Sequence, residues 1–470
     1  MRFKMKIIRL TVASLVLSLA SCSLSSTYVQ PELPAGPQWQ SGALQSAAQA
    51  RIECWWLTFE DPNLDKLVSV VISRNNNLLL AANEAYRAQL NADIAENGLL
   101  PSLGGGLSVD KPLGVQKPSG SSGTLNPNAS LEIDIWGKLA AKKDKAGFEA
   151  YATAEDYGAA RLFAIDNTVR AYFEIAHANE SLASAKASLA HVKRIQAIVR
   201  GQVAAGAASD LELRQAEQKV EELAAAVSSR KQDLLVVRNE LVVLLNGAPN
   251  PVSEPGRLPS KKLPPITPGL PAELLARRPD LRAAEARLRA TLKQVDQTRA
   301  GLYPSISITA ALRASSPRLL ELISAPAASV AAAMSFLDLK NMNLVMAVSK
   351  EEYDKQVLMF RNTLLNAFSE VANTLGERAN NAEQIRRHRN GLIAAQEIEQ
   401  LQEAKYLSGG IALQTLLDSQ ESRRAAEITL AASRLSQLRT ESKLYRIIGG
   451  GPERDAPSCH GIETRQRSNR

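Results

Sequence analysis

Cysteine and histidine, the side chains that most often bind metal ions or act as nucleophiles and bases, are scarce in this sequence. The 470 residues include three cysteines and four histidines. They are Cys22, Cys54, Cys459, His177, His191, His388 and His460. None of them falls in a CxxC, HExxH or similar ligand spacing, and four scattered histidines do not supply a nucleophile, a base and an orienting group. We therefore predict no metal site, no cofactor and no catalytic site, and these patterns assign no role to Cys54 or Cys459.

Cys22 is the one cysteine with a recognisable chemical context. A basic start is followed by a short apolar run over residues 10–20, which is shorter than the roughly 20 apolar residues of a membrane-spanning helix. The run ends in the tetrapeptide LASC, which resembles the lipobox of bacterial lipoproteins. The resemblance implies a signal peptide over residues 1–21 and S-diacylglycerol and N-acyl groups on Cys22. Ser23 rather than Asp follows, which in that class implies sorting to the outer membrane.

The net charge does not indicate nucleic-acid binding. The formal charge is +8, and four cations of the signal peptide, Arg2, Lys4, Lys6 and Arg9, supply +4 of it, leaving 8 − 4 = +4. No run of Lys and Arg interleaved with aromatic residues is present in the sequence. We predict no nucleic-acid partner.

The rest of the chain is organised around a forty-residue stretch, 207–246, that contains no proline and no glycine. Its apolar residues recur in alternating steps of three and four, which is a heptad pattern and is typical of a helix packed along others. The pattern runs through Leu213, Ala216, Val220, Leu223, Val227, Leu234, Val237, Leu241 and Leu244. Such a helix would be roughly 60 Å long, too long for one globular core. We expect it to line or brace an elongated structure.

An internal repeat relates the two halves of the chain. A shift of 203 positions superimposes Gly206 on Gly409 and Gly247 on Gly450. The same shift superimposes Gly98 on Gly301, Pro101 on Pro304 and other residues near them. Because one offset recurs at places far apart in the sequence, we predict a duplication of about 200 residues.

Each predicted repeat contains two segments in which apolar and polar residues alternate. In the first repeat the segments are residues 102–110 and 128–135, separated by a Gly/Ser/Pro-rich loop over 113–126. In the second repeat they are residues 305–313 and 330–336. Alternation over about 9 to 11 residues fits outer-membrane barrel strands, with an apolar face toward lipid and a polar face toward water. An ordinary half-buried hairpin has the same pattern.

Four strands raise a closure problem. A sheet edge cannot face lipid, and four strands are too few to close a barrel, so several chains must share one. Glu132 and Asp134 could suggest a catalytic carboxylate pair. On a strand they would share one face, which we predict to be the water-filled inner wall.

Long helices account for most of the remainder. We expect a helix that leads from residues 55–64 to Ala95, and further helices over 159–200 and 411–448, the last with a looser seam that includes Ile428. The chain would turn back near 201–209 and near 409–410, forming two helical hairpins. The predicted segments are a signal peptide (1–21), a lipid-anchored tether (22–54), a first repeat (55–247), a Pro-rich linker (248–270), a second repeat (271–451) and a disordered tail (452–470).

Several short motifs, in order, resemble those of one known family. They are YVQP from Tyr28, WW from Trp55 with DP from Asp61, LEIDIWG from Leu131, RRPD from Arg277, YPSIS from Tyr303, AF from Ala367 and LY from Leu444 with GGG from Gly449. Their order and spacing, over nearly the whole mature chain, are similar to the outer-membrane factor family, the TolC/NodT-like outer-membrane efflux lipoproteins. Each motif is weak alone, and together they agree with the duplication.

The resemblance implies an α+β membrane protein that works as a homotrimer. Its outer-membrane β-barrel would be shared, with four strands from each chain, and would continue into a long α-helical barrel in the periplasm. The implied function is passive conduction in a tripartite efflux system. An inner-membrane transporter would supply the energy through a periplasmic adaptor of the membrane fusion protein class, and outer-membrane lipid would surround the barrel. The exported cargo does not follow from the sequence.

In the family the helical hairpins close the periplasmic end of the tunnel near their turns. Position by position, the motif residues fall on Asp210 and Glu212 in the first hairpin and on Tyr406, Gln414 and Asp418 in the second. We expect these five residues to form a constriction, where carboxylates would favour cations. A solvated helix face is the alternative reading for each of them.

The sequence departs from the family pattern at three places. Glu421 stands where the family often has Arg, and Gln414 where an apolar residue is often found. After the fourth strand the family usually has Asp-x-Gly-Arg, whereas Asp338-Leu339-Lys340-Asn341 lacks the glycine. Arg423 and Arg424 could substitute as the cation of a closing ion pair. The main alternative to a channel is a lipid-anchored periplasmic coiled-coil scaffold or adaptor with a soluble β-domain.

Overall fold

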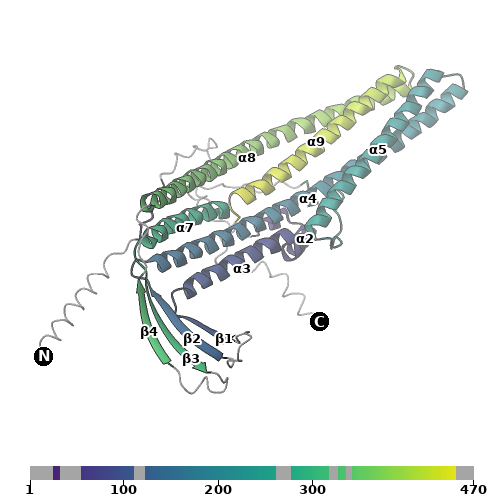
Figure 1. Cartoon of the computed structure of the whole chain (residues 1–470). Coiled ribbons are helices and arrows are strands. Elements are labelled where there is room, and N and C mark those ends of the chain that lie inside the picture. Colours follow the sequence, from purple (N-terminus) through teal and green to yellow (C-terminus); the bar gives the residue numbers. More distant parts are fainter. Residues whose placement is uncertain are drawn as a thin grey trace, which may run out of the picture. The chain divides into compact units, whose positions relative to one another are not determined.

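The computed structural model describes residues 25–31, 54–110, 122–260, 277–316, 327–334 and 341–450 (Figure 1). Cys22, the signal peptide, Leu339, Cys459 and the C-terminal tail lie outside these residues. The chain divides into two compact units. The strand unit comprises Met1–Pro34, Ala82–Asp156 and Asp280–Thr363, and the hairpin unit comprises Ala35–Ala81, Tyr157–Pro279 and Leu364–Arg470, each as far as the structure describes it.

A single antiparallel sheet with the strand order β1-β2-β3-β4 lies in the strand unit (Figure 1). The strands are β1 (Ser102–Asp110), β2 (Ser122–Ile133), β3 (Ile306–Ser316) and β4 (Ala327–Met334). β2 pairs with β3, so strands from the two predicted repeats are neighbours in one sheet. Within the described residues, β1 and β4 each have one unpaired edge.

The register of the sheet gives it one apolar and one polar face. Leu107 lies opposite Leu125, and Leu131 lies opposite Ile308. Since directly opposed residues point to the same side, the three leucines and the isoleucine share a face. On the other face, Ser130 and Thr309 are hydrogen-bonded through their hydroxyls at 3.2 Å. No sheet residue whose exposure is described is buried, so an ordinary half-buried hairpin does not fit.

The predicted limits of β2 were wrong at both ends. The strand begins at Ser122, inside the segment expected to be a loop, because pairing with β1 extends the ladder across Pro127 to Ser122. It ends at Ile133, so Asp134 lies outside the strand and does not share a strand face with Glu132. The Asp134 carboxylate instead accepts hydrogen bonds from the backbone N–H groups of Leu139 (3.0 Å) and Ala140 (2.7 Å). It therefore caps the helix that follows.

Four helices accompany the sheet in the strand unit. They are the later part of α3 (Asn76–Asn97), the first part of α4 (Lys138–Ala204), most of α7 (Pro279–Gly301) and the first part of α8 (Met342–Leu407). The contact between α4 and α7 is built from small residues, Ala152, Ala283 and Ala286, and is supplemented by an ion pair between Arg282 and Glu155 at 2.6 Å. Small side chains let the two helices approach closely.

Residues 25–31, predicted as part of a tether, lie along α7. The Asp296 carboxylate, which is 3 % exposed, accepts hydrogen bonds from the backbone N–H (3.0 Å) and hydroxyl (2.6 Å) of Ser26. The guanidinium of Arg289 lies 4.6 Å from the centre of the Tyr28 ring. Burial, followed by the charge of Glu285, raises the pKa of Tyr28 to about 12.

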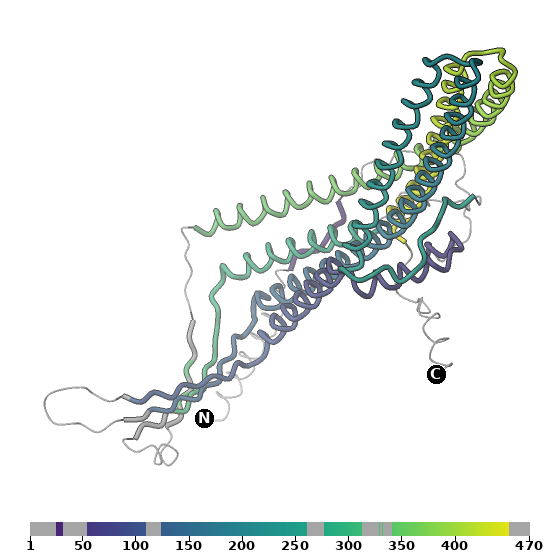
Figure 2. Tube along the Cα trace, turned by 90° about the vertical axis from the view of Figure 1, so that its right-hand side faces the viewer, coloured from purple at the N-terminus to yellow at the C-terminus, as the bar shows by residue number. Residues whose placement is uncertain are grey.

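The hairpin unit is built from two antiparallel helix pairs. The later part of α4 turns into α5 (Asp210–Leu244), and the later part of α8 turns into α9 (Leu413–Ile447), with the two turns side by side in both views (Figures 1 and 2). Before them come η1 (Trp55–Phe59) and α2 (Pro62–Arg74). Among the described helices, none combines the length and the apolar character needed to cross a membrane.

Two predicted helix boundaries were wrong. The first helix is interrupted at Asn75, whose side-chain amide donates to the carbonyl of Leu244 at 3.0 Å and whose Oδ1 accepts from the N–H of Leu78. α4 begins at Lys138 rather than at Ala159, and it runs through Gly158. The side chain of Pro279 lies 3.5 Å from the position that a Gly158 Cβ would take, which is an ordinary contact distance, so the packing there does not itself require a glycine.

The heptad seam of α5 is confirmed. Of its members, those that are buried are Ala216, Val220, Leu223, Val227, Leu234 and Leu241. On α9 the looser seam is correct for Leu435 and Leu438, but Ile428 is 45 % exposed and does not belong to it.

Aromatic residues form a compact core where η1 meets the ends of the hairpins. Trp55 is 1 % exposed, and its ring stacks on Tyr445 of α9 with centroids 5.1 Å apart and an interplanar angle of 11°. Phe59 completes the core by an edge contact to Trp55 at 6.4 Å and to Phe173 of α4 at 5.0 Å. η1 thus fixes the C-terminal end of α9 against α4.

A partly buried ionic network lies beside this core and gives a role to the RRPD motif. Arg278 is 6 % exposed and donates to the carbonyl of Ile447 at 3.0 Å and to Glu370 at 3.2 Å. Arg446 connects Glu370 (2.8 Å) to Asp166 (3.1 Å). Every charge in this network has an opposite partner, as buried charges require.

A carboxylate near the start of α2 makes the stability of the hairpin unit pH-dependent. Burial, followed by the charge of Asp61, raises the pKa of Asp65 to about 6 from its ordinary 3.8. The folded protein therefore binds this proton more tightly than the unfolded chain does, so the group favours folding below pH 4 and loses that contribution as the pH rises to 6. We expect Asp65→Asn to raise the melting temperature at pH 7 and to change it less at pH 4.5. Equal shifts at both pH values would contradict this.

Candidate functional site

The two hairpin turns have the same hydrogen-bonding pattern. In the first turn, the N–H of Gly206 (φ 73°) donates to the carbonyl of Val203 at 2.9 Å, and the N–H of Ala207 donates to the carbonyl of Gln202 at 2.8 Å. In the second turn, the N–H of Gly409 (φ 76°) donates to the carbonyl of Tyr406 at 2.9 Å, and the N–H of Gly410 donates to the carbonyl of Lys405 at 2.8 Å. Each glycine adopts the left-handed conformation that ends a helix at low cost. Each hydrogen bond of the second turn lies 203 residues after its counterpart in the first turn, which is the offset of the predicted duplication.

Asp210 and Glu212, the candidates on the first hairpin, lie in the first turn of α5. Glu212 is half-buried and belongs to a capping box, since its backbone N–H donates to the Ser209 hydroxyl (3.3 Å) and its carboxylate accepts from the Ser209 N–H (3.1 Å). Asp210 is exposed. Both carboxylates are favoured by the positive end of the helix dipole, so each has a structural role independent of any constriction.

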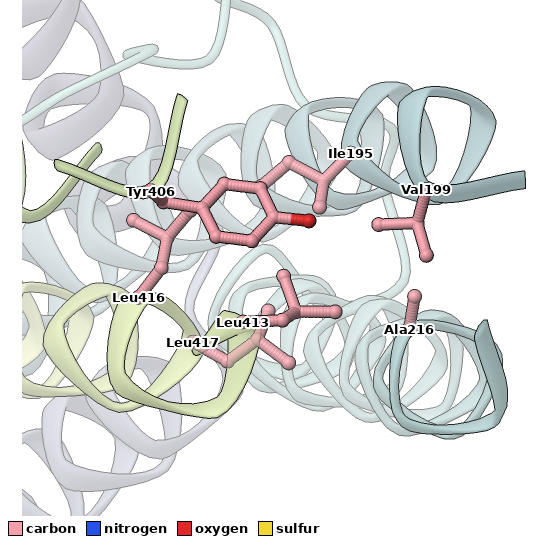
Figure 3. Packing of buried hydrophobic residues seen from close by; sticks show 7 residues of the cluster. All are labelled: Ile195, Val199, Ala216, Tyr406, Leu413, Leu416 and Leu417. Atoms are coloured by element: carbon pink, nitrogen blue, oxygen red, sulfur yellow. The ribbon is translucent and has the colours of Figure 1, made fainter. Parts of the chain in front are cut away.

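Tyr406 lies inside the core that the two hairpins share. Its side chain is 8 % exposed and packs with residues of α4, α5 and α9 (Figure 3). The cluster consists of Ile195, Val199, Ala216, Tyr406, Leu413, Leu416 and Leu417. The Tyr406 hydroxyl donates to Gln202 Oε1 of α4 at 3.3 Å. Burial, followed by the charge of Glu212, raises the pKa of Tyr406. Tyr406 therefore joins the two hairpins of one chain.

Gln414 and Asp418 lie one turn apart on α9, and both are exposed. The Gln414 amide donates to the Asp418 carboxylate at 2.7 Å, which fixes the two side chains relative to each other. Within the described part of the chain, no hydrogen bond or ion pair joins either of them to Asp210 or Glu212. The structure thus separates the candidates into a buried link, Tyr406, a half-buried capping residue, Glu212, and three exposed polar groups, Asp210, Gln414 and Asp418.

An ion pair between the hairpins was missed by sequence reasoning. Glu421 of α9 accepts from the ammonium of Lys219 of α5 at 2.9 Å and from Arg424 on its own helix. Burial raises the pKa of Glu421, but the hydrogen bonds from Lys219 and Arg424 outweigh it, so the pKa lies below its ordinary value. The signal was present in the sequence, because Glu421 replaces the family's Arg, but its partner lies 202 residues away. Glu421 is therefore paired with a cation from each helix, Lys219 of α5 and Arg424 of α9.

A second link joins α4 to α9 slightly farther from the turns. The buried Gln420 donates from its amide nitrogen to His191 Nε2 at 2.8 Å. Another contact joins α8 to α9, where Arg423 forms ion pairs with Glu399 and Glu427. In the part of the molecule that the structure describes, no three His, Cys, Asp or Glu side chains are grouped as metal ligands. The contacts near the turns join α4, α5, α8 and α9, and they would have to break if these helices separated.

Comparison with known proteins shows that a family model matches this chain twice. The family model described as Outer membrane efflux protein matches residues 67–247 and again residues 270–450. The two matches are offset by 203 residues at both ends, which confirms the predicted duplication.

Individual relatives cover almost the full chain. The sequence is 30 % identical over 465 residues to the antibiotic efflux pump outer membrane protein ArpC of Pseudomonas putida, covering 94 % of this chain and 95 % of the relative. It is 26 % identical over 457 residues to the cation efflux system protein CusC of Escherichia coli, covering 93 % and 97 %. The crystal structure of the Campylobacter jejuni CmeC outer membrane channel resembles this fold with a TM-score of 0.83 and 24 % sequence identity. The match covers 94 % of this chain and 98 % of the CmeC chain.

These matches confirm the predicted fold class, with its long helices, short strands and two repeats, and they favour the channel over the scaffold or adaptor alternative. They also agree with the open sheet and paired hairpins described above. The chain belongs to the outer membrane efflux protein family and is the outer-membrane channel component of an efflux system.

Proposed function

We propose that three copies of this chain close one β-barrel by pairing β4 of each copy with β1 of the next. The observation that carries this proposal is the open sheet, whose apolar face is uncovered in the described residues and whose outer strands each have a free edge. Lipid tolerates no unpaired backbone edge. Since all pairings within the sheet are antiparallel, β1 and β4 run in opposite directions. Joining them between copies therefore continues the antiparallel pattern around the barrel.

The proposed gate consists of the two hairpin turns. Tyr406 and the Lys219–Glu421 pair hold the hairpins of one copy together, and Asp210, Glu212, Gln414 and Asp418 provide polar groups near the turns. Separating the hairpins would widen the periplasmic entrance. The exposed carboxylates Asp210 and Asp418 would favour cations there.

The proposed partners are a periplasmic adaptor and an inner-membrane transporter that supplies the energy. Acyl groups on Cys22 anchor each copy in the outer-membrane lipid. The relatives ArpC and CusC are named for antibiotic efflux and cation efflux, respectively. Because relatives of one fold serve such different solutes, cargo selection belongs to the transporter, and this chain conducts drugs, toxic compounds or metals passively.

Two measurements test the proposed assembly. The detergent-extracted protein is expected to migrate as a trimer that dissociates on heating, and to conduct ions in planar bilayers. A monomer that becomes soluble on removal of the lipid would support a periplasmic scaffold instead. Deleting the gene and measuring sensitivity to antibiotics, solvents and metal ions would identify the cargo class, and co-purification would identify the partners.

The faces of β1 offer a matched pair of substitutions. Leu107 is 61 % exposed on the apolar face, and its neighbour Ser108 points to the opposite face. We expect Leu107→Arg to cost about 2 kcal/mol per copy and to reduce the yield of outer-membrane trimer, because it places a charge against lipid. Ser108→Arg is expected to assemble normally. Equal yields of the two variants, measured on unheated gels of purified outer membranes, would contradict the proposed orientation.

A further inference from the structure

Glu132 carries a carboxylate on the polar face of the sheet, at the end where the strands lead into the helices. It lies two residues along β2 from Ser130, whose hydroxyl is hydrogen-bonded to that of Thr309 at 3.2 Å. Side chains two residues apart in a strand point to the same face. The only other charged residues in the four described strands, Asp110 and Arg313, lie toward the opposite end of the sheet. Glu132 is therefore the one charged residue of these strands at the junction with the helices.

Lys138, the first residue of α4, neutralises this carboxylate. Its ammonium donates to Glu132 Oε1 at 2.9 Å, and the two side chains are 38 % and 32 % exposed. Within the described part of the chain, neither group forms a second ion pair. The nearby carboxylate of Asp134 has partners of its own, the backbone N–H groups of Leu139 and Ala140 at the positive end of the helix dipole. Glu132 and Lys138 thus form a one-to-one pair that is partly open to water.

We propose that Lys138 determines the charge selectivity of the conduit at this junction, by cancelling a ring of Glu132 carboxylates. The inference rests on the proposed function, in which three copies close one barrel and the polar face of the sheet lines its water-filled interior. Each copy then contributes one carboxylate and one ammonium group at the same level. The pairs therefore add no net charge to this level of the conduit.

Pairing changes what a passing ion experiences. Rings of like-charged side chains let a channel select ions of one sign. The potential of a lone carboxylate falls with the first power of distance, whereas two opposite charges whose nitrogen and oxygen lie 2.9 Å apart act as a dipole, and its potential falls with the square. Lys138 therefore suppresses the cation preference that three unpaired carboxylates would create. Selection by charge is then left to the entrance, where Asp210 and Asp418 are exposed.

An ion pair that only braces β2 against α4 would have the same geometry, but it predicts a different result. A pair that is about one-third exposed adds little to stability, so replacing either partner should leave the trimer intact. A brace alone predicts that neutral variants keep the selectivity of the wild type. A selectivity ring predicts changes of opposite sign when the lysine and the glutamate are replaced singly, and cancellation when both are replaced.

The decisive measurement is the ratio of K⁺ to Cl⁻ permeability, obtained from reversal potentials of purified trimers in planar bilayers under a KCl gradient. At about 10 mM salt the screening length is about 30 Å, so charges on the wall act across a wide lumen. We expect Lys138→Gln to raise the ratio about twofold or more, and Glu132→Gln to lower it by a similar factor. The double variant should return to the wild-type ratio. At about 1 M salt the screening length is about 3 Å, and all four proteins should agree.

Lys143 provides a matched control. It forms an ion pair with Glu96 of α3 at 2.6 Å and is 41 % exposed. It lies five positions beyond Lys138, about 140° around α4. Lys143→Gln removes the same charge from the same helix and is expected to leave the ratio unchanged. Lys142, which is exposed one turn beyond Lys138, is the same in every variant, so differences between the variants report the pair alone.

The outcomes separate failure of this inference from failure of the proposed function. Absence of a conducting trimer in the wild type would overturn the shared barrel itself. Each variant is also measured together with Tyr406→Ala, so that a closed entrance in series does not hide the ring. A shift of the predicted sign in either background supports the inference. Conducting trimers whose ratios are equal in both backgrounds would retain the channel and refute the ring, and so would an equal shift in Lys143→Gln.

A second substitution covers the case in which a variant does not assemble. Lys138→Met keeps the length of the side chain and removes the charge, and it is expected to give the same ratio as Lys138→Gln. Trimer yield is measured for both on unheated gels of purified outer membranes. Loss of the trimer in both variants would show that the pair is a brace required for assembly, and the selectivity role would be wrong.

Discussion

Replacing Trp55 with alanine is expected to lower the free energy of unfolding by about 3–5 kcal/mol, the usual loss for a fully buried large aromatic residue. Trp55 is 1 % exposed and contacts the rings of Tyr445, Trp56 and Phe59. The substitution would leave a cavity where η1 meets α4 and α9. Because η1 is short, the loss of this one anchor should release it from both helices.

Two control variants separate ring packing from other effects. The indole N–H of Trp55 is buried without a hydrogen-bond partner in the described residues, so Trp55→Phe removes an unsatisfied donor as well as part of the ring. Its expected loss is well below that of Trp55→Ala. Leu57 on the same short helix is 43 % exposed, and Leu57→Ala should be nearly neutral. Thermal unfolding followed by circular dichroism gives all three values, and a Trp55→Ala variant as stable as Leu57→Ala would refute the anchoring role.

Local periodicity was sufficient to predict the repeated parts of the fold. The alternation of Leu103, Leu107 and Val109 with polar residues predicted which face of β1 would be apolar, and the register with β2 confirms it. The heptad pattern of α5 likewise identified its buried seam. In both cases the relevant neighbours are repeated along the element, so a short window of sequence contains the information.

The features that sequence reasoning missed depend on contacts between distant segments. The break at Asn75 is stabilised by the carbonyl of Leu244, and the early start of β2 depends on pairing with β1. α4 continues through Gly158, and the side chain that packs nearest to that position belongs to Pro279, at the start of α7. None of these partners can be identified from a local pattern, since each belongs to another element.

The same limit applied to the candidate gate. The resemblance placed Tyr406 among the gate candidates, but it did not reveal that the side chain lies in a core shared by both hairpins. Nor did it reveal the pair between Lys219 and Glu421, which are 202 residues apart. The structure therefore distinguishes residues that join the hairpins from residues such as Asp418 that are exposed.

Replacing Tyr406 with alanine is expected to favour separation of the two hairpins by about 3 kcal/mol, because it removes a ring from the centre of their shared core. In a two-state equilibrium between closed and open turns, 3 kcal/mol corresponds to a change of more than about 100-fold. If hairpin separation opens the channel, the variant should conduct through planar bilayers far more often than the wild type. Single-channel recording of the purified protein measures this directly.

Two controls show whether an increase in conductance comes from gating or from general destabilisation. Tyr406→Phe keeps the ring and removes only the 3.3 Å hydrogen bond to Gln202, so its open fraction should rise by about fivefold or less. Leu435 is 7 % exposed on α9, outside the cluster at the turns, and Leu435→Ala should lower stability without raising conductance. If Leu435→Ala opened the channel as readily as Tyr406→Ala, the gate could not be assigned to the turns. A selective effect of Tyr406→Ala would mean that the aromatic core between the hairpins, rather than the exposed carboxylates, supplies most of the energy that holds the entrance closed.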